Sequence, residues 1–456
     1  MTLQIGSNED CFSVLRFAGP SFADMRTISL RKCLIAGCFV LVLVIFRMSL
    51  LDSLNSWRAI AMSMDISKGD SVSREMFEQM YQLYDIRDVD CAGLFSQKNG
   101  SLDNALSKSK SAEWKGFRFH EDFYLKKTKH CGNFQRERGY IMTSLTKLED
   151  EFPLAYSLVV FKDIEMVERL LRAVYRPQNV YCIHVDVKAK TEFFEAMTSI
   201  ASCFPNVYMS PTRISVVWGK FSVLEPELVC MEELMKRSSR WKYFINLTGQ
   251  EFPLKTNREL VEILTSFKGA NDVEGVRREA NKVRFINKPS DLDVVPTKGA
   301  VHVVVNREFV DYVLHDPVSK KLQDWLRTVD VPDETLFSTL NHNPQLGIRG
   351  SFIGLDDVER MMPRKPWVNR YKSWLGAPCA GRRIRTVCIL STGDLPRMHA
   401  SPNFFANKFY LHEDRVAIGC LEQRLFNNTR DLHLGRTRVN TAFYEESIFV
   451  RNRLIK

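Results

Sequence analysis

Asp186 is the side chain whose place in the sequence first suggests chemistry. It ends the apolar run 180–185, and a second apolar run, 156–161, is joined to that one by residues 164–174, whose apolar positions recur at helical spacing. Strand, helix and strand within about 30 residues predict two parallel strands with a right-handed crossover. Ligands bind outside the carboxyl ends of such strands. Asp186 is therefore either a contact for a ligand such as a ribose or base, or a turn residue that ends a strand.

Two other groups of charged residues invite a functional interpretation. Asp88-Val-Asp90 and Asp291-Leu-Asp293 have a spacing that can hold a metal ion against a diphosphate, but the first lies in a polar stretch and the second in an irregular charged segment. We interpret both as solvated charge. No GxGxxG follows the first predicted strand, which disfavours a dinucleotide site.

The elements that position these residues belong to a mixed α/β chain. Further strands are predicted at 214–218, 241–246 and 300–305, with helices over 228–235 and 258–264 between them. The 456 residues are 45% hydrophobic and 26% charged, which is typical of a globular protein. The net charge of +10 suits nucleic acid, an anionic membrane or a phosphorylated small molecule. Nucleic acid is disfavoured, because no zinc-finger or RNA-binding signature occurs.

The N-terminal third predicts a membrane-anchored protein. Residues 33–51 are almost entirely apolar, interrupted by Arg47, and basic residues precede them. This pattern predicts a single-pass type II anchor with residues 1–32 in the cytosol. A cleaved signal peptide is the alternative. Residues 52–130 are mixed and polar and predict a stem and N-terminal luminal region, followed by a folded domain over 131–456.

Cysteines and glycosylation sequons bear on the compartment. Sequons occur at Asn99, Asn246 and Asn427, and the one at Asn246 follows an apolar run that could bury it. A luminal location permits four disulfides among the eight cysteines after the anchor, although sequence alone leaves 105 pairings, and scattered free thiols remain the alternative. These cysteines are Cys91, Cys131, Cys182, Cys203, Cys230, Cys379, Cys388 and Cys420.

Five motifs, in order, resemble one known family. They are VYCIHVD, WKYFINLTGQEFPLKTN, VPDETLFSTL, RIRTVCI and FFANKF. Together they resemble the core 2 β1,6-N-acetylglucosaminyltransferases, Golgi enzymes that branch mucin-type O-glycans, and in part the related peptide O-xylosyltransferases. The resemblance implies a GT-A-type fold with a Rossmann-like mixed sheet, a UDP-sugar donor, an O-glycan or glycoprotein acceptor, inversion at the anomeric carbon, and no metal or other cofactor. It also implies disulfides Cys91–Cys420, Cys131–Cys203, Cys182–Cys230 and Cys379–Cys388.

The same resemblance assigns the catalytic and donor-binding residues. Glu334 matches the family's catalytic glutamate, which takes the proton from the acceptor hydroxyl. It follows Pro332, which suits the first turn of a helix, and the positive end of a helix favours an ionised carboxylate. A first-turn glutamate that only stabilises its helix would look the same locally. The donor contacts carried over are Val159, Asp186, Trp218, Arg385 and Lys408.

The acceptor side and the donor sugar follow less directly. Glu274 matches the family's acceptor glutamate, Lys282 and Arg284 its basic pair, and Tyr371 its aromatic residue, with Trp367 and Trp374 nearby. Phe161 and Trp218 replace a family histidine and tyrosine. The favoured function is transfer of N-acetylglucosamine; UDP-glucose as donor, a peptide O-xylosyltransferase and an inactive luminal binding glycoprotein are the alternatives.

Overall fold

The computed structural model describes residues 74–86, 88–111, 119–276, 284–354 and 367–455. The chain divides into two units, Met1–Glu75 and Met76–Lys456, and the elements below belong to the second. The predicted tail and anchor, residues 1–32 and 33–51, lie outside the described residues. Among the helices that are described, none is long and apolar enough to cross a membrane.

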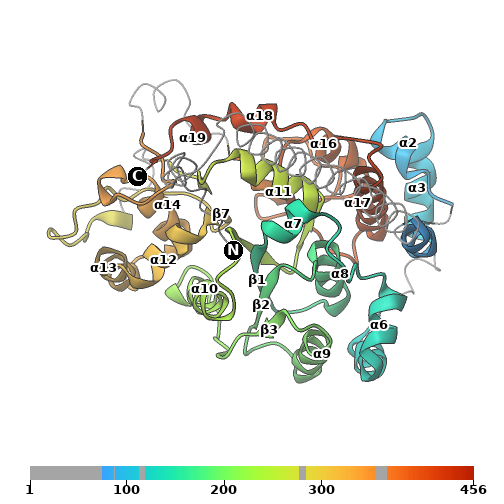
Figure 1. Cartoon of the computed structure of the whole chain (residues 1–456), viewed down its shortest axis with the longest axis horizontal. Helices are drawn as coiled ribbons and strands as arrows, with labels where there is room; N and C mark the ends of the chain where they lie inside the picture. Colours follow the sequence, from blue (N-terminus) through green and yellow to red (C-terminus); the bar gives the residue numbers. More distant parts are fainter. Residues whose placement is uncertain (1–73, 87, 112–118, 277–283, 355–366, 456) are drawn as a thin grey trace, which may run out of the picture. The chain divides into compact units, whose positions relative to one another are not determined.

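A six-stranded mixed sheet forms the centre of this unit, in the order β3-β2-β1-β4-β7-β6 (Figure 1). The first four of these strands are parallel, whereas β7 runs antiparallel to both β4 and β6. The mixed α/β class predicted from the sequence is thereby confirmed. The strands are β1 (Leu154–Val160), β2 (Val180–Val185), β3 (Val207–Met209), β4 (Tyr243–Thr248), β6 (Asp272–Val273) and β7 (Val303–Asn306).

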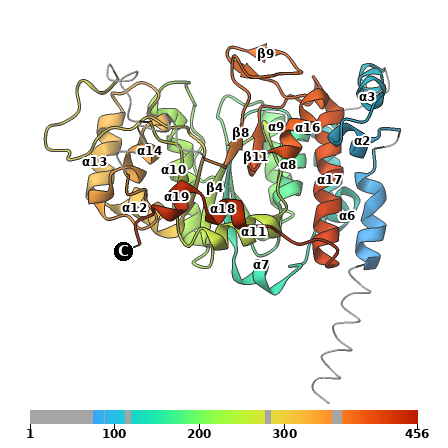
Figure 2. The same cartoon turned by 90° about the horizontal axis from the view of Figure 1, so that it is seen from above.

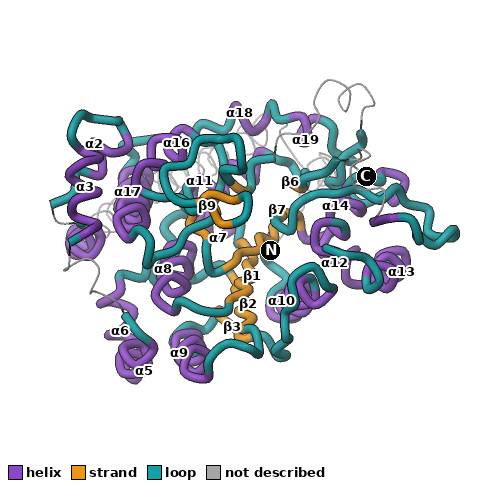
Figure 3. Tube along the Cα trace, turned by 180° about the vertical axis from the view of Figure 1, so that it is seen from behind, coloured by secondary structure: helices purple, strands orange, loops and turns teal. Residues whose placement is uncertain are grey.

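Helices cover both faces of the sheet because its strands are apolar on both sides (Figures 1 and 3). Leu154 and Tyr156 of β1 face a core shared with α8, α9 and α11, and Ala155 faces one shared with α10, α12 and α13. The predicted crossover helix is confirmed. These helices are α8 (Ile164–Val174), α9 (Thr191–Ala201), α10 (Glu225–Arg237), α11 (Asn257–Ser266), α12 (Arg307–His315) and α13 (Pro317–Leu326).

A smaller three-stranded sheet lies beside the first and holds the C-terminal motifs. Its order is β5-β11-β8, and a short hairpin of β9 and β10 follows β8 in sequence and projects beyond it in Figure 2. A third hydrophobic core, in addition to the two that cover the faces of the central sheet, packs this smaller sheet against α2, α16 and α17. The elements of this part are β5 (Glu251–Pro253), β8 (Arg370–Tyr371), β9 (Arg383–Ile384), β10 (Val387–Cys388), β11 (Phe405–Asn407), α16 (Leu395–Ala400) and α17 (Arg415–His433). The remaining helices, which pack into the two cores of the central sheet, are α14 (Leu336–Asn341), α18 (Ala442–Glu445) and α19 (Ile448–Arg451).

The stem predicted over 52–130 is not a linker throughout, since the second unit already begins at Met76. The polar stretch after Cys91 forms a helix whose small residue Ala105 is buried against the third core. Polar composition alone suggested a linker, but Val89, Leu94 and Ala105 are buried in the third core and Cys91 is joined to Cys420 by a disulfide. The helices here are α2 (Cys91–Phe95), α3 (Ser101–Lys110), α5 (Glu121–Lys127), α6 (Cys131–Arg138) and α7 (Lys147–Glu151).

Candidate active site

A cavity of about 630 Å³ brings together segments that are far apart in the sequence. It lies among the residues that precede β7, the Pro332–Glu334 turn, and the segment that contains β8. Its polar and aromatic lining residues are Glu274, Arg284, Lys298, His302, Glu334, Trp367, Asn369, Arg370, Lys372, Trp374 and Thr386. Glu274, Arg284 and Glu334 are residues that the sequence predicts for the acceptor side and the catalytic base. The predicted Lys282 lies outside the described residues.

Glu334 presents its carboxylate on the wall of this cavity. The Pro332–Glu334 segment forms a single 3₁₀ turn before the short helix α14. Two cations contact the same oxygen, Oε2, at 3.1 Å from Arg284 Nη1 and 3.4 Å from Lys298 Nζ. The negative charge of Glu334 therefore has two direct ionic partners. The sequence predicted that the positive end of a helix would favour this charge, but the turn at Glu334 is too short to carry a large dipole, and the two side chains take its place.

The aromatic wall of the cavity differs from the prediction for Tyr371. Successive residues of a strand point to opposite sides, and it is Arg370 of β8 and Lys372, which follows β8, that line the cavity. Tyr371 packs instead against the third core, where it is hydrogen-bonded to Arg397. Trp367 and Trp374 supply the aromatic surface, so this placement favours them over Tyr371 as acceptor contacts.

A buried ionic network forms one side of the cavity. Glu251 accepts hydrogen bonds from Arg370 Nε at 3.0 Å and from the ring of His302. Burial alone would raise the pKa of Glu251, but the Arg370 guanidinium, His302 and Lys372 together outweigh it and lower that pKa to about 2. Burial lowers the pKa of His302 to about 3, so its ring is neutral, and its Nδ1 lies 3.4 Å from Lys372 Nζ. The network therefore anchors the ammonium of Lys372 at the cavity.

The predicted donor contacts Val159 and Asp186 lie at, or directly after, the carboxyl ends of two adjacent strands. Val159 of β1 is paired with His184 of β2 and Thr248 of β4. Asp186 follows β2, and its carboxylate accepts from the backbone N–H of Lys188 at 2.8 Å and of Val216 at 3.3 Å. Asp186 therefore ends the strand and also stands at the edge where ligands bind, so its position fits both predicted roles, a turn residue and a ligand contact.

Residues 214–218, predicted as a strand, form a loop that side chains hold in place. The N–H of Ile214 donates to His184 Nε2 at 2.9 Å, and that of Val217 donates to Ser222 Oγ at 2.9 Å. Because these backbone groups are satisfied by side chains, no neighbouring strand is needed. The loop leaves Trp218 72% exposed.

Trp218 and Arg385, two predicted donor contacts separated by 167 positions in the sequence (385 − 218), meet in the structure. The Arg385 guanidinium lies 5.2 Å from the centre of the Trp218 ring, within cation–π range. Lys408 lies directly after β11, and its carbonyl accepts from Leu390 N–H at 2.9 Å. An aromatic platform and a guanidinium together are suited to a nucleotide base and its phosphates.

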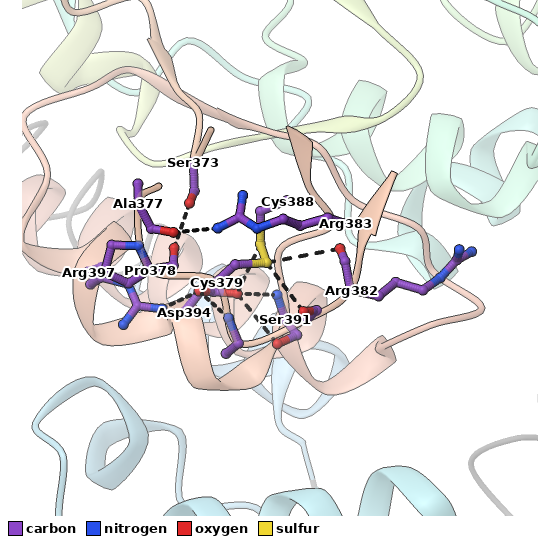
Figure 4. Close-up of a disulfide and its surroundings, with 12 residues drawn as sticks. Ser373, Ala377, Pro378, Cys379, Arg382, Arg383, Cys388, Ser391, Asp394 and Arg397 are labelled. Atoms are coloured by element: carbon purple, nitrogen blue, oxygen red, sulfur yellow. Dashed lines mark hydrogen bonds and ion pairs between the residues drawn. A yellow bond between two sulfur atoms is a disulfide. The ribbon is translucent and has the colours of Figure 1, made fainter. Parts of the chain in front are cut away.

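The hairpin that carries Arg385 is braced by the Cys379–Cys388 disulfide and by Asp394 (Figure 4). Asp394 accepts from the N–H of Ala380 at 3.0 Å and of Ser391 at 2.9 Å. These bonds fix both ends of the loop, so the arginine projects from a rigid base. The structure also forms Cys91–Cys420, Cys131–Cys203 and Cys182–Cys230, the pairs that the resemblance implies.

The sequons occupy three different environments. Asn246 is buried on β4, where its amide donates to Val301 O and its Oδ1 accepts from Val303 N–H, each at 2.8 Å. A glycan has no room there in the folded chain. Asn99 is exposed, and Asn427 is half-buried on α17.

Comparison with known proteins decides the family. A family profile described as Core-2/I-branching enzyme matches residues 154–399, more than half of the chain. The chain belongs to the Core-2/I-branching enzyme family. It is therefore a glycosyltransferase, and the resemblance drawn from the five motifs is confirmed.

Relatives of this Core-2/I-branching enzyme match most of its length. It is 33% identical over 420 residues to the beta-1,3-galactosyl-O-glycosyl-glycoprotein beta-1,6-N-acetylglucosaminyltransferase 3 of Ovis aries, covering 85% of this chain and 93% of that one. It is 37% identical over 334 residues to the Homo sapiens protein named beta-1,3-galactosyl-O-glycosyl-glycoprotein beta-1,6-N-acetylglucosaminyltransferase, covering 68% and 78%. The mannosyltransferase Ktr4p of S. cerevisiae, solved with GDP, matches at a TM-score of 0.26 and 10% identity over 59% of this chain and 80% of that one, which supports no conclusion.

Sequence reasoning missed Lys298, His302 and Lys372, although all three line the cavity. None belongs to a motif that signals catalysis, and the segments that carry them are brought together only by the sheet. The one local sign is Gly299, which follows Lys298 and marks a close approach of two backbones.

Proposed function

We propose that this chain is an inverting, metal-independent Golgi glycosyltransferase, with a GT-A-type fold and a type II membrane anchor at residues 33–51. It transfers N-acetylglucosamine in β1,6 linkage from UDP-N-acetylglucosamine to an O-glycan that contains galactose and N-acetylgalactosamine. The proposal rests on the carboxylate of Glu334, which Arg284 and Lys298 hold on the wall of a cavity that also presents Glu274. The names of the relatives describe this transfer for those proteins.

Glu334 acts as the general base in the proposed reaction. Its carboxylate takes the proton of the acceptor hydroxyl while the hydroxyl oxygen attacks the anomeric carbon. The bond from that carbon to UDP breaks on the opposite face, which inverts the configuration. The proton ends on Glu334 and the electron pair on UDP.

Arg385 and Lys408 stabilise the charge that develops on the departing diphosphate. The proposed independence of a metal is supported by the roles of the aspartate pairs. Asp291 is 70% exposed and forms an ion pair with Lys321, and Asp90 caps α2 and contacts Lys98 at 3.2 Å. Both pairs thus serve as surface charge or as helix caps.

UDP-glucose is the second donor we consider, because Phe161 and Trp218 remove polar groups that the family resemblance places near the donor. Release of UDP from a panel of UDP-sugars by the purified full chain decides between them. A free glycan acceptor and a serine peptide, tested side by side, separate O-glycan branching from peptide O-xylosylation. Absence of turnover with every donor and acceptor would support the inactive binding glycoprotein instead.

Glu334→Gln tests the catalytic assignment. The amide keeps the shape of the side chain but cannot take a proton, so turnover should fall roughly 100-fold or more, while UDP binding persists. Glu308→Gln, which changes a 58% exposed glutamate outside the cavity, is the matched control and should leave turnover unchanged. Near-normal turnover of Glu334→Gln would exclude Glu334 as the base.

A further inference from the structure

Both cations that contact Glu334 approach the same carboxylate oxygen. Arg284 Nη1 and Lys298 Nζ lie 3.1 and 3.4 Å from Oε2. In the part of the chain that the structure describes, Oε1 has no hydrogen-bond partner. The two oxygens of the Glu334 carboxylate are thus in different electrostatic surroundings. A general base that presents one particular oxygen to its substrate needs such a difference.

The backbone that carries Lys298 is fixed to the backbone that carries Glu334. The N–H of Gly299 donates to the carbonyl of Glu334 at 2.7 Å. Lys298 itself forms an isolated bridge with Val276, with hydrogen bonds of 2.7 and 3.1 Å. A Cβ at Gly299 would come within 1.9 Å of Ser338 Oγ and 2.2 Å of the Glu274 carbonyl oxygen, so this approach requires glycine. Hydrogen bonds to Val276 and to the Glu334 carbonyl therefore fix the backbone that presents the ammonium of Lys298 to Glu334.

We propose that Lys298 is a positioning residue for the transfer reaction. With Arg284 it holds Oε2 of Glu334 as a charged anchor and turns Oε1 toward the acceptor hydroxyl. The proton then passes from that hydroxyl to Oε1 as the new glycosidic bond forms and the bond to UDP breaks. This role rests on the proposed function of Glu334 as the base, and it assigns to Lys298 a task that no sequence motif indicates.

The other charges around Glu334 do not duplicate this contact. Lys372 also lines the cavity, but its nearest partner is His302 at 3.4 Å, and burial lowers the pKa of Lys372. On the negative side stand Glu274, in the same cavity, and the neighbouring Asp333, whose pKa burial raises to about 6. Removing Lys298 therefore leaves Glu334 with one direct cation among the described residues.

The test compares Lys298→Met, which keeps the length of the side chain, with Lys298→Arg, which keeps the charge. In Lys298→Met we expect turnover to fall about 10-fold, because a freely rotating carboxylate loses orientation, with the KM for the UDP-sugar unchanged. Lys298→Arg should restore most of the turnover. Lys320→Met, an exposed lysine of α13, is the matched control.

A double variant distinguishes action through Glu334 from a separate effect. If Lys298 works only by positioning Glu334, adding Lys298→Met to Glu334→Gln should lower turnover no further. Wild-type turnover in Lys298→Met would overturn the inference, and so would a Lys298→Arg variant that melts like wild type but is as slow as Lys298→Met. Either result leaves the proposed function intact, which fails only if wild type does not transfer sugar or Glu334→Gln remains active.

Discussion

Glu227 should make the stability of the fold depend on pH in an unusual direction. It lies on α10 and is almost fully buried against the central sheet, where it accepts hydrogen bonds from Ser157 Oγ and from Asn246 Nδ2 at 3.4 Å. In the described surroundings of this carboxyl no cation forms an ion pair with it. Burial raises the pKa of Glu227 to about 7 from an ordinary value of 4.5.

The sign follows from proton binding. Between pH 4.5 and 7 the folded state holds the proton more tightly than the unfolded state, so the contribution of Glu227 to stability is largest at low pH and is lost as the pH rises through 7. At 1.36 kcal/mol per pKa unit, the two pKa values give a loss of about 2.5 kcal/mol between pH 5 and pH 8. Glu227→Gln is neutral at every pH and should avoid this loss.

Urea unfolding of wild type and Glu227→Gln at pH 5 and pH 8 measures the effect. We expect similar free energies of unfolding at pH 5 and a variant more stable by about 2 kcal/mol at pH 8. Glu232→Gln on the same helix removes an exposed ion pair with Lys236 and should change stability only slightly, and by the same amount at either pH. A Glu227→Gln variant that is less stable than wild type at pH 8 would refute the reasoning.

Two further predictions concern the donor side. Arg385→Lys and Lys408→Ala should each lower donor-saturated turnover as well as donor affinity, because both cations act on charge that develops as UDP leaves; wild-type turnover should survive excess EDTA, and a loss that manganese reverses would instead implicate a metal. Reductant should lower activity, because opening the Cys379–Cys388 bridge releases the hairpin that carries Arg385, at a cost of about 2–5 kcal/mol. Mass mapping of the non-reduced protein should find these two cysteines joined, and a free thiol at either would contradict this.

The sequence predicted the elements whose pattern is local. The run 180–185 forms β2 and the helical spacing over 164–174 forms α8, with the same bounds. The prediction at 214–218 was wrong, because an apolar run does not reveal that His184 and Asp186 bind its backbone. Ala105 likewise shows that a mostly polar helix needs little burial to join the fold.

The structure brings some of the predicted site residues together in one cavity and adds others that no motif indicated. Glu334 and Arg284 share one cavity as the resemblance implied, but Tyr371 was chosen by its place in the sequence and the alternation of β8 turns it away. Lys298 and Lys372 could not be found, since their relation to Glu334 exists only after β7, β8 and the Pro332 turn have come together. Contacts that form only in the folded chain have no characteristic residue spacing that could be recognised in the sequence.

The Cys91–Cys420 disulfide makes most of the catalytic unit a covalently closed ring. During synthesis this ring cannot close until residue 420 has left the ribosome, so maturation of the enzyme depends on one of its last helices. Once it is closed, a protease cut in a loop between these cysteines leaves both fragments attached. A cut before Cys91 frees the ring whole. Shedding from the proposed anchor would therefore release an intact enzyme, and nicked molecules would be distinguishable from intact ones only after reduction.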